Sequence, residues 1–590
     1  MALRDGAIVG ILTAAQEIAV TVGLWTRTPA LPTIAVAGPR LPPPGKPSMF
    51  KSASLLVLLG AGLLAAPAQA RPSVPATHPG VEVVLDASAS APAGGRLLVF
   101  AIDAQAARAQ AKDGKVEAVD TSPFRPTETA VVAREVPRLQ PGVAVTLDDS
   151  DLAFPAPLSQ LPPGDYLLQA VLDVDHDYNY GGRGAGDLVS DVVSVHLPSA
   201  VPPRLQLART LPGRGDPWTA VAGRLPPALQ PHLEQARAHI EPIDFTSPAL
   251  SAFRGEPVPM RGWVVLPPGY ERGSQRYPTV YFTHGFGGRL DYLLANAATF
   301  YAGMAEGQFP PMIWVLLDQS GPTGTHEFAD SVNNGPWGQA LTAELIPALE
   351  ARYRMDARPS GRLLTGHSSG GWATLWLQVR YPAVFGGTWS TAPDSSDFHD
   401  FTGADLYAAH ANVYHRADGS VLPLVRNDGK VIATFQQFAQ LERVLGAYGG
   451  QMASFEWVFS PRGADGRPLP MFDRDSGDVD PAVVAYWRER YDIAHRIERD
   501  WPALKPDLDG KIHVIVGTAD TFYLDGAAHR LQAVLDGLGA RSDFRFPEGR
   551  THFDLLTVGE DRQGLLKQIA REMYAVARPG ADDQAPPAGR

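Results

Sequence analysis

The 590-residue sequence contains no cysteine. Disulfide bonds, thiolate metal sites and cysteine nucleophiles are therefore excluded. An excess of positive charge is also missing: the formal net charge is −12, which argues against nucleic-acid binding as the main function. Charged residues make up 19% and hydrophobic residues 45%, which is the balance of a globular protein with more than one domain.

Long uninterrupted apolar runs are missing as well. After residue 70, no segment reaches the roughly 18 apolar residues of a transmembrane helix, so we expect no membrane span. A shorter apolar run lies within "MFKSASLLVLLGAGLLAAPAQA", residues 49–70, after Lys51 and before a small-x-small ending. This layout is typical of a secretory signal peptide. We therefore predict export to the periplasm or outside the cell, and we expect residues 1–48 to be no part of the mature protein.

The remaining chain changes its pattern twice. Residues 77–198 consist of short β-branched runs between Gly, Pro and Asp clusters, which predicts an all-β, sandwich-like domain. After a Pro-rich linker (199–250), strands alternate with helices over 251–578, which predicts an α/β fold with a doubly covered, mostly parallel sheet. Residues 401–505 interrupt this alternation and predict an insertion near the carboxyl edge of that sheet. The Pro- and Ala-rich end, 579–590, predicts a disordered tail.

The segment "LLTGHSSGGWATLW", residues 363–376, contains the pattern Gly-x-Ser-x-Gly between an apolar strand and an apolar helix. This is the nucleophile-elbow pattern, in which glycines two residues to either side of the serine allow strand and helix to approach closely. Ser368 has Gly366 and Gly370 at these positions, whereas Ser369 does not. The alternative is a serine that only caps a helix. The spacing favours Ser368 as a nucleophile.

A serine nucleophile needs a base, and the base needs an orienting carboxylate. In folds of this kind the chain order is serine, acid, histidine. The last histidine, His552 in "FPEGRTHFD", follows the final predicted strand and is the candidate base. Asp520 in "VIVGTADTFYLD" follows the penultimate strand and is the candidate acid. Asp525 is the reserve, and Asp394 and Asp397 are more distant alternatives.

Negative charge that develops on the reacting oxygen needs backbone donors. We expect the N–H group of Ser369 to be one of them, because it follows the nucleophile. The glycine-rich loop "YFTHGFGG" follows an early strand and supplies the N–H of Phe286 as the second. His284 in this loop is predicted to be structural rather than a second base.

Four segments together, "RYPTVYFTHGFGG", "LLTGHSSGGWATL", "VGTADTFYL" and "EGRTHF", resemble the esterase D-like branch of the α/β-hydrolases. The resemblance covers about residues 255–575 apart from the insertion. This branch includes enterochelin esterases, feruloyl and acetyl-xylan esterases, S-formylglutathione hydrolases and mycolyltransferases. The resemblance implies an α/β-hydrolase fold, and it implies the same residues: Ser368 as nucleophile, His552 as base, Asp520 as acid, and the amides of Phe286 and Ser369 as the oxyanion hole.

We therefore predict an exported serine carboxylic-ester hydrolase that works through an acyl-enzyme. Its expected substrate is a small-molecule or polysaccharide-linked ester, and no cofactor, metal or nucleic acid is expected. One alternative is an acyltransferase to a sugar or alcohol that uses the same triad. Another is a non-catalytic secreted binding protein with a hydrolase-like domain. The sequence leaves the oligomeric state open.

A second motif, "LDVDHDYNYGGRGAGD", places acidic or amide side chains at alternate positions from Asp173 to Asn179. This resembles the start of a calcium-binding loop. The sixth position holds Tyr178 instead of glycine, and the twelfth holds Gly184 instead of glutamate. A polar loop between two strands is the preferred interpretation.

Overall fold

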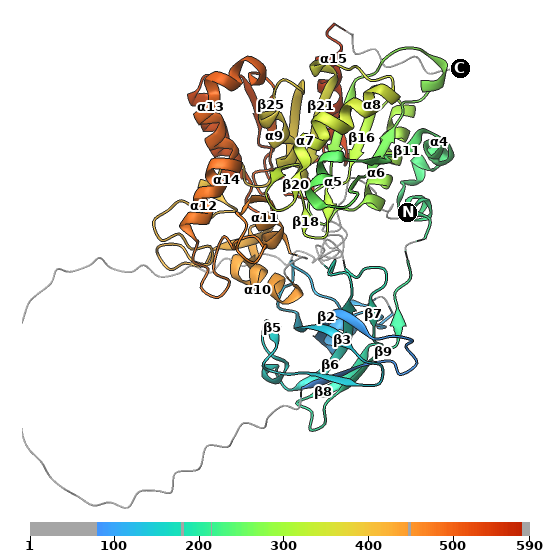
Figure 1. Ribbon diagram of the computed structural model, residues 1–590, viewed down its shortest axis with the longest axis vertical. Coiled ribbons are helices and arrows are strands. Elements are labelled where there is room, and N and C mark those ends of the chain that lie inside the picture. Colours follow the sequence, from blue (N-terminus) through green and yellow to red (C-terminus); the bar gives the residue numbers. More distant parts are fainter. Residues whose placement is uncertain (1–79, 112, 179–181, 214, 447–449, 581–590) are drawn as a thin grey trace, which may run out of the picture. The chain divides into compact units, whose positions relative to one another are not determined.

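The structure is a computed structural model that describes residues 80–580 except 112, 179–181, 214 and 447–449. The predicted leader segments, 1–48 and 49–70, lie outside the described residues, as does most of the predicted tail. Figure 1 follows the described chain from the N-terminal strands to the last helix, α15.

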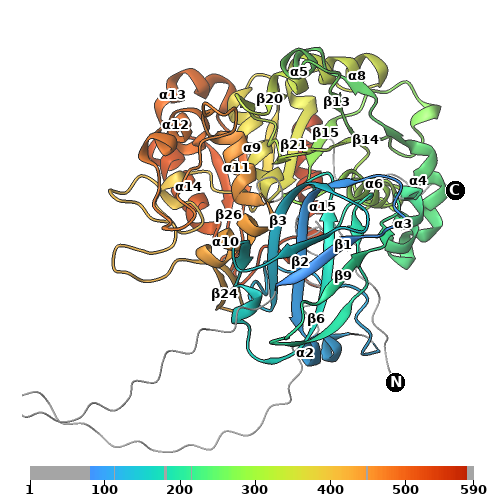
Figure 2. The same ribbon diagram turned by 60° about the horizontal axis from the view of Figure 1, so that its bottom comes forward.

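Two β-sheets form the N-terminal β-domain, residues 80–210. The larger sheet has the order β10-β7-β6-β2-β3-β5, with β8 also paired to β6, and all of its pairs are antiparallel. The smaller sheet has the order β4-β1-β9, in which β1 and β9 run parallel (Figure 2). The strands are β1 (Val81–Leu85), β2 (Ala93–Asp103), β3 (Thr129–Leu139), β4 (Ala144–Leu147), β5 (Leu152–Phe154), β6 (Gly164–Asp173), β7 (Leu188–Val189), β8 (Val193–Leu197), β9 (Arg204–Leu207) and β10 (Arg209–Thr210).

The last two strands of this domain lie inside the segment predicted as a linker, 199–250. Strand β9 shows alternating burial over four residues only, which is too short a pattern to distinguish from irregular chain in the sequence. Pairing with β1 converts it into a strand, because β1 offers a free edge whose backbone groups need partners.

Side chains of the central strand β2 alternate between two hydrophobic clusters, as the period of a strand requires. Leu97 and Val99 face the smaller sheet. Leu98 and Phe100 point the other way and pack with residues of α10 (Phe435–Leu445), a helix of the insertion (Figure 1). The side chain of Arg96 adds a hydrogen bond of 2.7 Å to a backbone carbonyl oxygen of that helix. The β-domain therefore covers one face of the insertion.

An eight-stranded sheet forms the core of the second part, in the order β11-β14-β16-β15-β21-β22-β25-β26. The first two pairs are antiparallel and all later pairs are parallel. The strands are β11 (Ile240–Pro242), β14 (Gly262–Val265), β15 (Thr279–Thr283), β16 (Ile313–Leu317), β21 (Arg362–His367), β22 (Gly387–Thr391), β25 (Ile512–Ile515) and β26 (Ser542–Arg545). The predicted α/β-hydrolase fold behind an N-terminal β-domain is confirmed, although β11 begins before residue 251.

Helices cover both faces of this sheet. Strand β16 shows this directly, because Trp314 packs in the cluster that contains α6, whereas Ile313 and Val315 pack in the cluster that contains α8. The helices outside the insertion are α2 (Ala104–Gln110), α3 (Pro217–Arg224), α4 (Leu233–His239), α5 (Pro248–Arg254), α6 (Leu290–Ala305), α7 (Trp337–Ala340), α8 (Ile346–Arg352), α9 (Ser369–Arg380), α14 (Asp525–Gly537) and α15 (Gly564–Ala577).

The insertion, residues 401–505, brings a hairpin and further helices to the carboxyl side of the sheet. These are β23 (Pro423–Asn427), β24 (Lys430–Thr434), α10, α11 (Gln451–Phe459), α12 (Pro481–Tyr491) and α13 (Ile493–Leu508), which runs slightly beyond it. Short hairpins elsewhere are β12 (Phe245–Thr246) with β13 (Pro259–Met260), β17 (Ser320–Gly321) with β18 (Gly324–Thr325), and β19 (Asp330–Ser331) with β20 (Gly335–Pro336). Asp492 separates α12 from α13, since its side chain accepts the His495 amide and caps α13.

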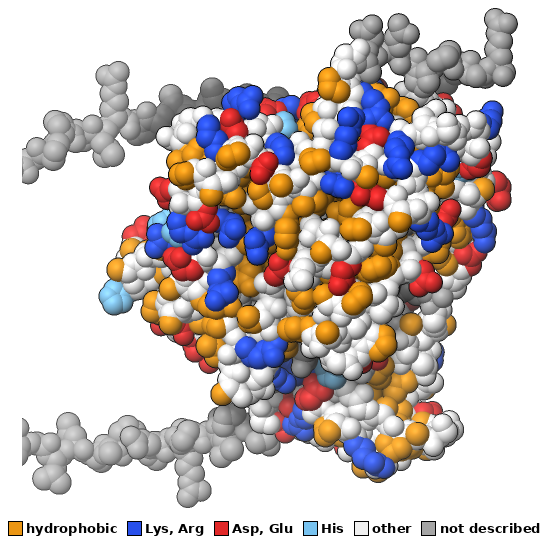
Figure 3. Space-filling view, turned by 45° about the horizontal axis from the view of Figure 1, so that its top comes forward, with side chains coloured by type: hydrophobic (Ala, Val, Ile, Leu, Met, Phe, Trp, Pro, Cys, Tyr) orange, Lys and Arg blue, Asp and Glu red, His pale blue; other side chains and the backbone are white. Residues whose placement is uncertain are grey.

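The described helices include none that is both long and apolar enough to cross a membrane. On the face drawn in Figure 3, basic and acidic side chains are interspersed. That face offers no continuous basic area of the kind that binds a nucleic-acid backbone.

Candidate active site

Ser368 stands at the turn between β21 and α9. Its backbone adopts φ 60° and ψ −128°, a conformation that non-glycine residues rarely take. The two glycines of the motif make this turn possible. A Cβ atom on Gly366 would overlap the carbonyl oxygen of Gly370, and one on Gly370 would overlap the carbonyl oxygen of Thr283. The strained serine and the tight helix approach are those of a nucleophile elbow.

His552 and Asp520 form a buried hydrogen-bonded pair. The Nδ1 atom of His552 lies 2.9 Å from Oδ2 of Asp520, and the side chains are 3% and 0% exposed. The other oxygen of Asp520 accepts the amides of Phe522 and Leu524. Burial alone would raise the pKa of Asp520, but the neighbouring His552 and these hydrogen bonds lower it below its ordinary value. An ionised Asp520 can therefore hold the imidazole ring with Nε2 free for chemistry.

The other carboxylates considered from the sequence have different partners. Asp525 forms an ion pair of 3.0 Å with Arg426. Asp394 accepts the hydroxyl of Ser369, and Asp397 accepts the backbone amide of His399. Of the four candidates, Asp520 is the one that bonds His552.

The two amides predicted for the oxyanion hole lie at the same edge of the sheet. Thr283, the last residue of β15, pairs with Gly366 of β21, and each chain continues three residues to Phe286 and to Ser369. His284, in between, is buried. Its Nε2 atom accepts the backbone amide of Gln319 at 3.0 Å, which ties the loop to the end of β16. This geometry suits the structural role predicted for His284.

A second histidine, to which no sequence motif gives a role, lies against the candidate base. The ring of His367 packs against the ring of His552 with 4.5 Å between centroids. Burial first, and then the charge of His552, lower the pKa of His367 to about 3. The ring beside His552 is therefore uncharged at neutral pH and does not oppose the imidazolium that a general base forms.

A cavity with a volume of about 30 Å³ opens beside Ser368. Most of its apolar wall comes from the insertion, and Phe522 and Leu524 come from the loop that follows Asp520. The insertion residues that line it are Phe401, Thr402, Leu424, Phe438, Gln451, Met452 and Phe455. The helical pattern of the insertion gave no sign of which face would meet the nucleophile.

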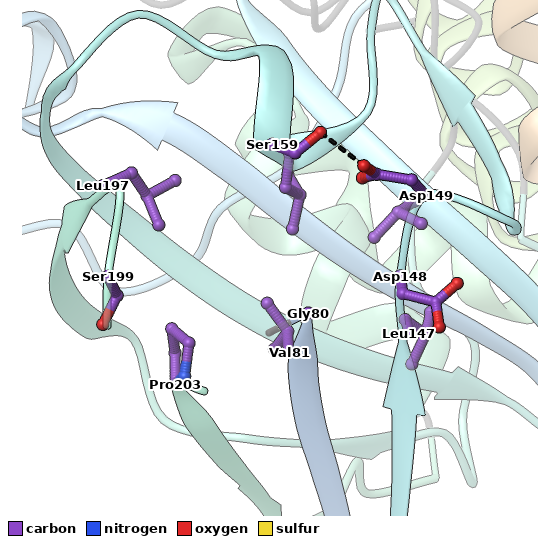
Figure 4. A pocket seen from close by; sticks show the side chains of 11 residues that line it. Gly80, Val81, Leu147, Asp148, Asp149, Ser159, Leu197, Ser199 and Pro203 are labelled. Carbon is purple, nitrogen blue, oxygen red and sulfur yellow. Dashed lines mark hydrogen bonds between the residues drawn. The ribbon is translucent and has the colours of Figure 1, made fainter. Parts of the chain in front are cut away.

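Two other cavities lie away from Ser368. One of about 20 Å³ is lined only by residues of the β-domain, among them Ser159, which donates a hydrogen bond to Asp149 (Figure 4). The other, of about 240 Å³, lies on the side of α11 that carries Ala453 and Trp457. Neither contains the catalytic candidates.

The acidic loop of the β-domain gathers Asp173, Asp177 and Asp187, whose carboxylate oxygens lie within 4.8 Å of one another. Two of these carboxylates accept amides of the loop itself: Asp173 accepts those of Asp177 and Tyr178, and Asp187 accepts that of Gly184. This hydrogen bonding is that of a polar connection between strands. Asn179 lies outside the described residues.

An aromatic residue of the β-domain, Phe124, packs against rings that surround His552. Phe124, in the segment between α2 and β3, belongs to the hydrophobic cluster of the α/β part. Its ring centroid lies 5.5 Å from that of Phe553 and 6.2 Å from that of Phe522. Both of these rings also contact His552, at 5.4 Å and 4.9 Å. The sequence contained no signal for this contact.

Comparisons with known proteins agree with the predicted resemblance. A family model described as "Putative esterase" matches residues 257–525, a segment that contains Ser368 and Asp520 and ends before His552. Esterase Rv1288 of Mycobacterium tuberculosis is 29% identical over 147 residues, which cover 24% of this chain and 31% of that protein. The chain thus spans about a third of the length of this curated relative.

One more curated protein and one solved structure also match parts of this chain. An endo-1,4-beta-xylanase/feruloyl esterase of Xylanibacter ruminicola is 29% identical over 138 residues, covering 21% of this chain and 18% of that protein. A solved structure of a ferulic acid esterase aligns with 57% of this chain and 98% of its own, with 14% identity and a TM-score of 0.35.

We expect Phe124→Ala to lower kcat for a p-nitrophenyl ester by about 10-fold, because Phe522 and Phe553 lose the ring that supports them against His552. The measurement is steady-state kinetics on variants whose melting temperature is recorded in parallel. Phe154→Ala is the matched control, since Phe154 is also a buried phenylalanine of the β-domain but packs in a different cluster. An equal loss in both variants would attribute the effect to the stability of the domain.

Proposed function

We propose that this protein is a serine carboxylic-ester hydrolase that works through an acyl-enzyme, in keeping with the match of residues 257–525 to the family model described as "Putative esterase". The observation that carries the proposal is the buried hydrogen bond between Asp520 and His552. The ring of His552 packs against that of His367, the residue that directly precedes the strained Ser368. Structural serines need none of this arrangement.

In the proposed reaction the hydroxyl oxygen of Ser368 attacks the carbonyl carbon of the ester, and its proton passes to Nε2 of His552. Asp520 keeps the proton on Nδ1 and stabilises the imidazolium. The negative oxygen accepts hydrogen bonds from the amides of Phe286 and Ser369. His552 then gives its proton to the departing alkoxide. A water molecule, deprotonated by His552, attacks the acyl-enzyme and releases the acid.

The cavity beside Ser368 indicates that the insertion holds the acyl group of the substrate and that this group is short and apolar. Phenylalanine, leucine and methionine side chains make up most of its wall, and its volume is about 30 Å³. A single water requires ~10–15 Å³ in such a measure, so the space corresponds to an acyl group of a few heavy atoms. The names of the relatives indicate feruloyl and other esters for those proteins.

Export is part of the proposal. It is supported by the basic, apolar and small-residue sequence of residues 49–70, which lies outside the described part of the chain. In a cell fractionation, the proposal requires a product in the periplasm or the medium that lacks these residues.

Replacement of the nucleophile tests the proposal most directly. We expect Ser368→Ala to lower kcat for p-nitrophenyl acetate by at least ~10⁴-fold, because neither the oxyanion donors nor His552 can replace the missing oxygen nucleophile. Ser369→Ala keeps Ser368 and serves as the comparison. Covalent labelling by a fluorophosphonate should disappear in Ser368→Ala and persist in Ser369→Ala. Unchanged hydrolysis in that variant would refute the assignment.

Substitution of Asp520 and of Asp525 tests which of these two aspartates is the acid of the triad. We expect Asp520→Asn to lower kcat by about 10³- to 10⁴-fold, since an amide cannot stabilise the imidazolium and favours the wrong tautomer. Asp525→Asn should lose less than ~5-fold, because its ion pair with Arg426 is partly exposed and contributes little. Steady-state kinetics on both variants decide the matter. A larger loss in Asp525→Asn would reverse the assignment.

Widening the cavity should change the preferred acyl chain. We expect Phe455→Ala to raise the ratio of kcat/KM for the p-nitrophenyl butyrate and acetate esters by ~10-fold or more, as one or two methylenes then fit without a clash. Phe459→Ala removes a buried ring from the same helix without touching the cavity and is the control. A ratio that stays constant in Phe455→Ala would place the acyl group elsewhere.

A further inference from the structure

Two buried carboxyl groups, those of Asp394 and Glu327, interact with the Ser369 side chain. The hydroxyl of Ser369 donates a hydrogen bond of 2.5 Å to Oδ2 of Asp394, which follows β22. Glu327 is fully buried in the loop after β18, and its Oε1 accepts the hydroxyl of Thr325 at 2.8 Å. From the sequence, Asp394 is only a more distant alternative for the acid, and no motif points to Glu327.

Neither carboxyl group has a cationic partner of its own. Among the described residues, no lysine or arginine forms an ion pair with Glu327 or Asp394. The other titratable groups that act on Asp394 are Asp520 and His552, which form their own pair. His326, next to Glu327, is buried with a pKa of about 3, stacks on Trp337 and carries no charge at neutral pH.

Burial therefore favours the protonated form of both carboxyl groups. Burial raises the pKa of Asp394 to about 6, and the Ser369 hydroxyl opposes that rise. Burial first, and then the charge of Asp394, raise the pKa of Glu327 well above its ordinary value. Double ionisation of two buried, interacting carboxyl groups is unfavourable, and Glu327, whose pKa rises more, is the group that keeps the proton.

The hydrogen bonds are consistent with that location. Ser369 has one hydroxyl proton, and Asp394 receives it. The Oε2 atom of Glu327 is buried and accepts no hydrogen bond, although Ser369 lies within hydrogen-bonding reach of this carboxyl group. A proton on Oε2 completes a chain in which Glu327 donates to the oxygen of Ser369 and Ser369 donates to Asp394.

The backbone holds both carboxyl groups in place. Glu327 and Phe328 have φ values of 55° and 47°, and Ala392, two residues before Asp394, has 40°. Non-glycine residues adopt these left-handed conformations at a cost, and they persist where the surroundings enforce them. Thr325 is held in turn by Ser454 of α11, whose hydroxyl accepts its amide at 2.9 Å. The helix that lines the cavity thus also supports the pair.

We propose that Glu327 and Asp394 are positioning residues that share one proton, hold the hydroxyl of Ser369 and thereby keep its backbone amide aimed into the oxyanion hole. The inference rests on the proposed function, which gives that amide its role. Oxyanion donors act only when their distance and direction match the developing charge, so a small displacement of Ser369 lowers the rate of the chemical step. Neither carboxyl group needs to touch the substrate.

Ionisation of Glu327 at alkaline pH would break the chain. A second negative charge would then face Asp394, and the oxygen of Ser369 would lose a donor. Glutamine imitates the protonated acid, because its NH₂ group can donate to Ser369 while its carbonyl oxygen accepts Thr325. Alanine provides neither group. The two substitutions therefore separate the hydrogen-bond chain from its proton.

The test uses the purified full chain and p-nitrophenyl acetate, with kcat and KM measured from pH 6 to pH 10. We expect Glu327→Gln to stay within ~3-fold of the unaltered protein at pH 7 and to lose part of its alkaline decline in kcat. Glu327→Ala should lower kcat by ~10- to 100-fold at unchanged KM. The proposal is overturned if Glu327→Gln keeps the full alkaline decline, or if Glu327→Ala keeps the original kcat.

A stability measurement tests the pair without reference to activity. The unfolded chain loses the Glu327 proton near pH 4.5, whereas the folded protein keeps it to much higher pH. The stability that this group contributes is thus present below pH 4.5 and falls as the pH rises toward the folded pKa. The melting temperature of Glu327→Gln, relative to that of the unaltered protein, should therefore rise from pH 5 to pH 9. A difference in melting temperature that stays constant over this range contradicts the shared proton.

The two proposals fail in different ways. If Ser368→Ala keeps its activity, the proposed function is wrong, and the melting experiment on Glu327→Gln still decides whether the buried proton exists. If Ser368→Ala is inactive while Glu327→Ala and Ser369→Ala retain full kcat, the enzyme assignment stands and the positioning role is wrong.

Discussion

The close approach of α9 to β15 and β21 is the constraint on which the site depends. Gly366 and Gly370 leave no room for a Cβ atom at this contact, and Ser368 between them takes a strained backbone conformation. Since the helix begins at the very next residue, the amide of Ser369 belongs to its first turn, where backbone N–H groups have no partner inside the helix. One packing contact thus fixes the positions of both Ser368 and the backbone amide of Ser369.

Three separate parts of the chain form the surroundings of Ser368: the ends of the parallel strands, the insertion and the β-domain. The ends of the parallel strands carry the serine, the acid and the histidine, as expected where loops meet at the carboxyl edge of such a sheet. The insertion supplies most of the cavity wall, and its helix α10 packs against the β-domain through Leu441 and Val444. The β-domain also contributes Phe124 to the rings around His552. Under the proposed function, a change in the insertion could therefore alter the acyl preference while Ser368, Asp520 and His552 stay the same.

Burial decides which groups of the site are charged. His367 stays neutral, and Asp520 stays ionised because His552 and two amides stabilise its charge. Burial raises the pKa of Glu327 and of Asp394, as the proposed shared proton requires. Each state follows from the balance between the loss of water and the hydrogen bonds that replace it. The hydroxyl of Ser369, for which the sequence suggested no part, lies at the centre of that balance.

By itself the sequence predicted the alternation of strands and helices after residue 250, the α/β class and Ser368 rather than Ser369 as the nucleophile, because these depend on local periodicity and on glycine spacing. It also led to His552 and Asp520 through chain order. Only the tertiary structure decided that β9 and β11 are strands, that the insertion faces the nucleophile, that Phe124 meets Phe553, and that Glu327 and Asp394 share a site. Such contacts join residues that lie far apart in the chain. The burial that results from them sets the protonation of the buried groups, and no local sequence pattern reveals it.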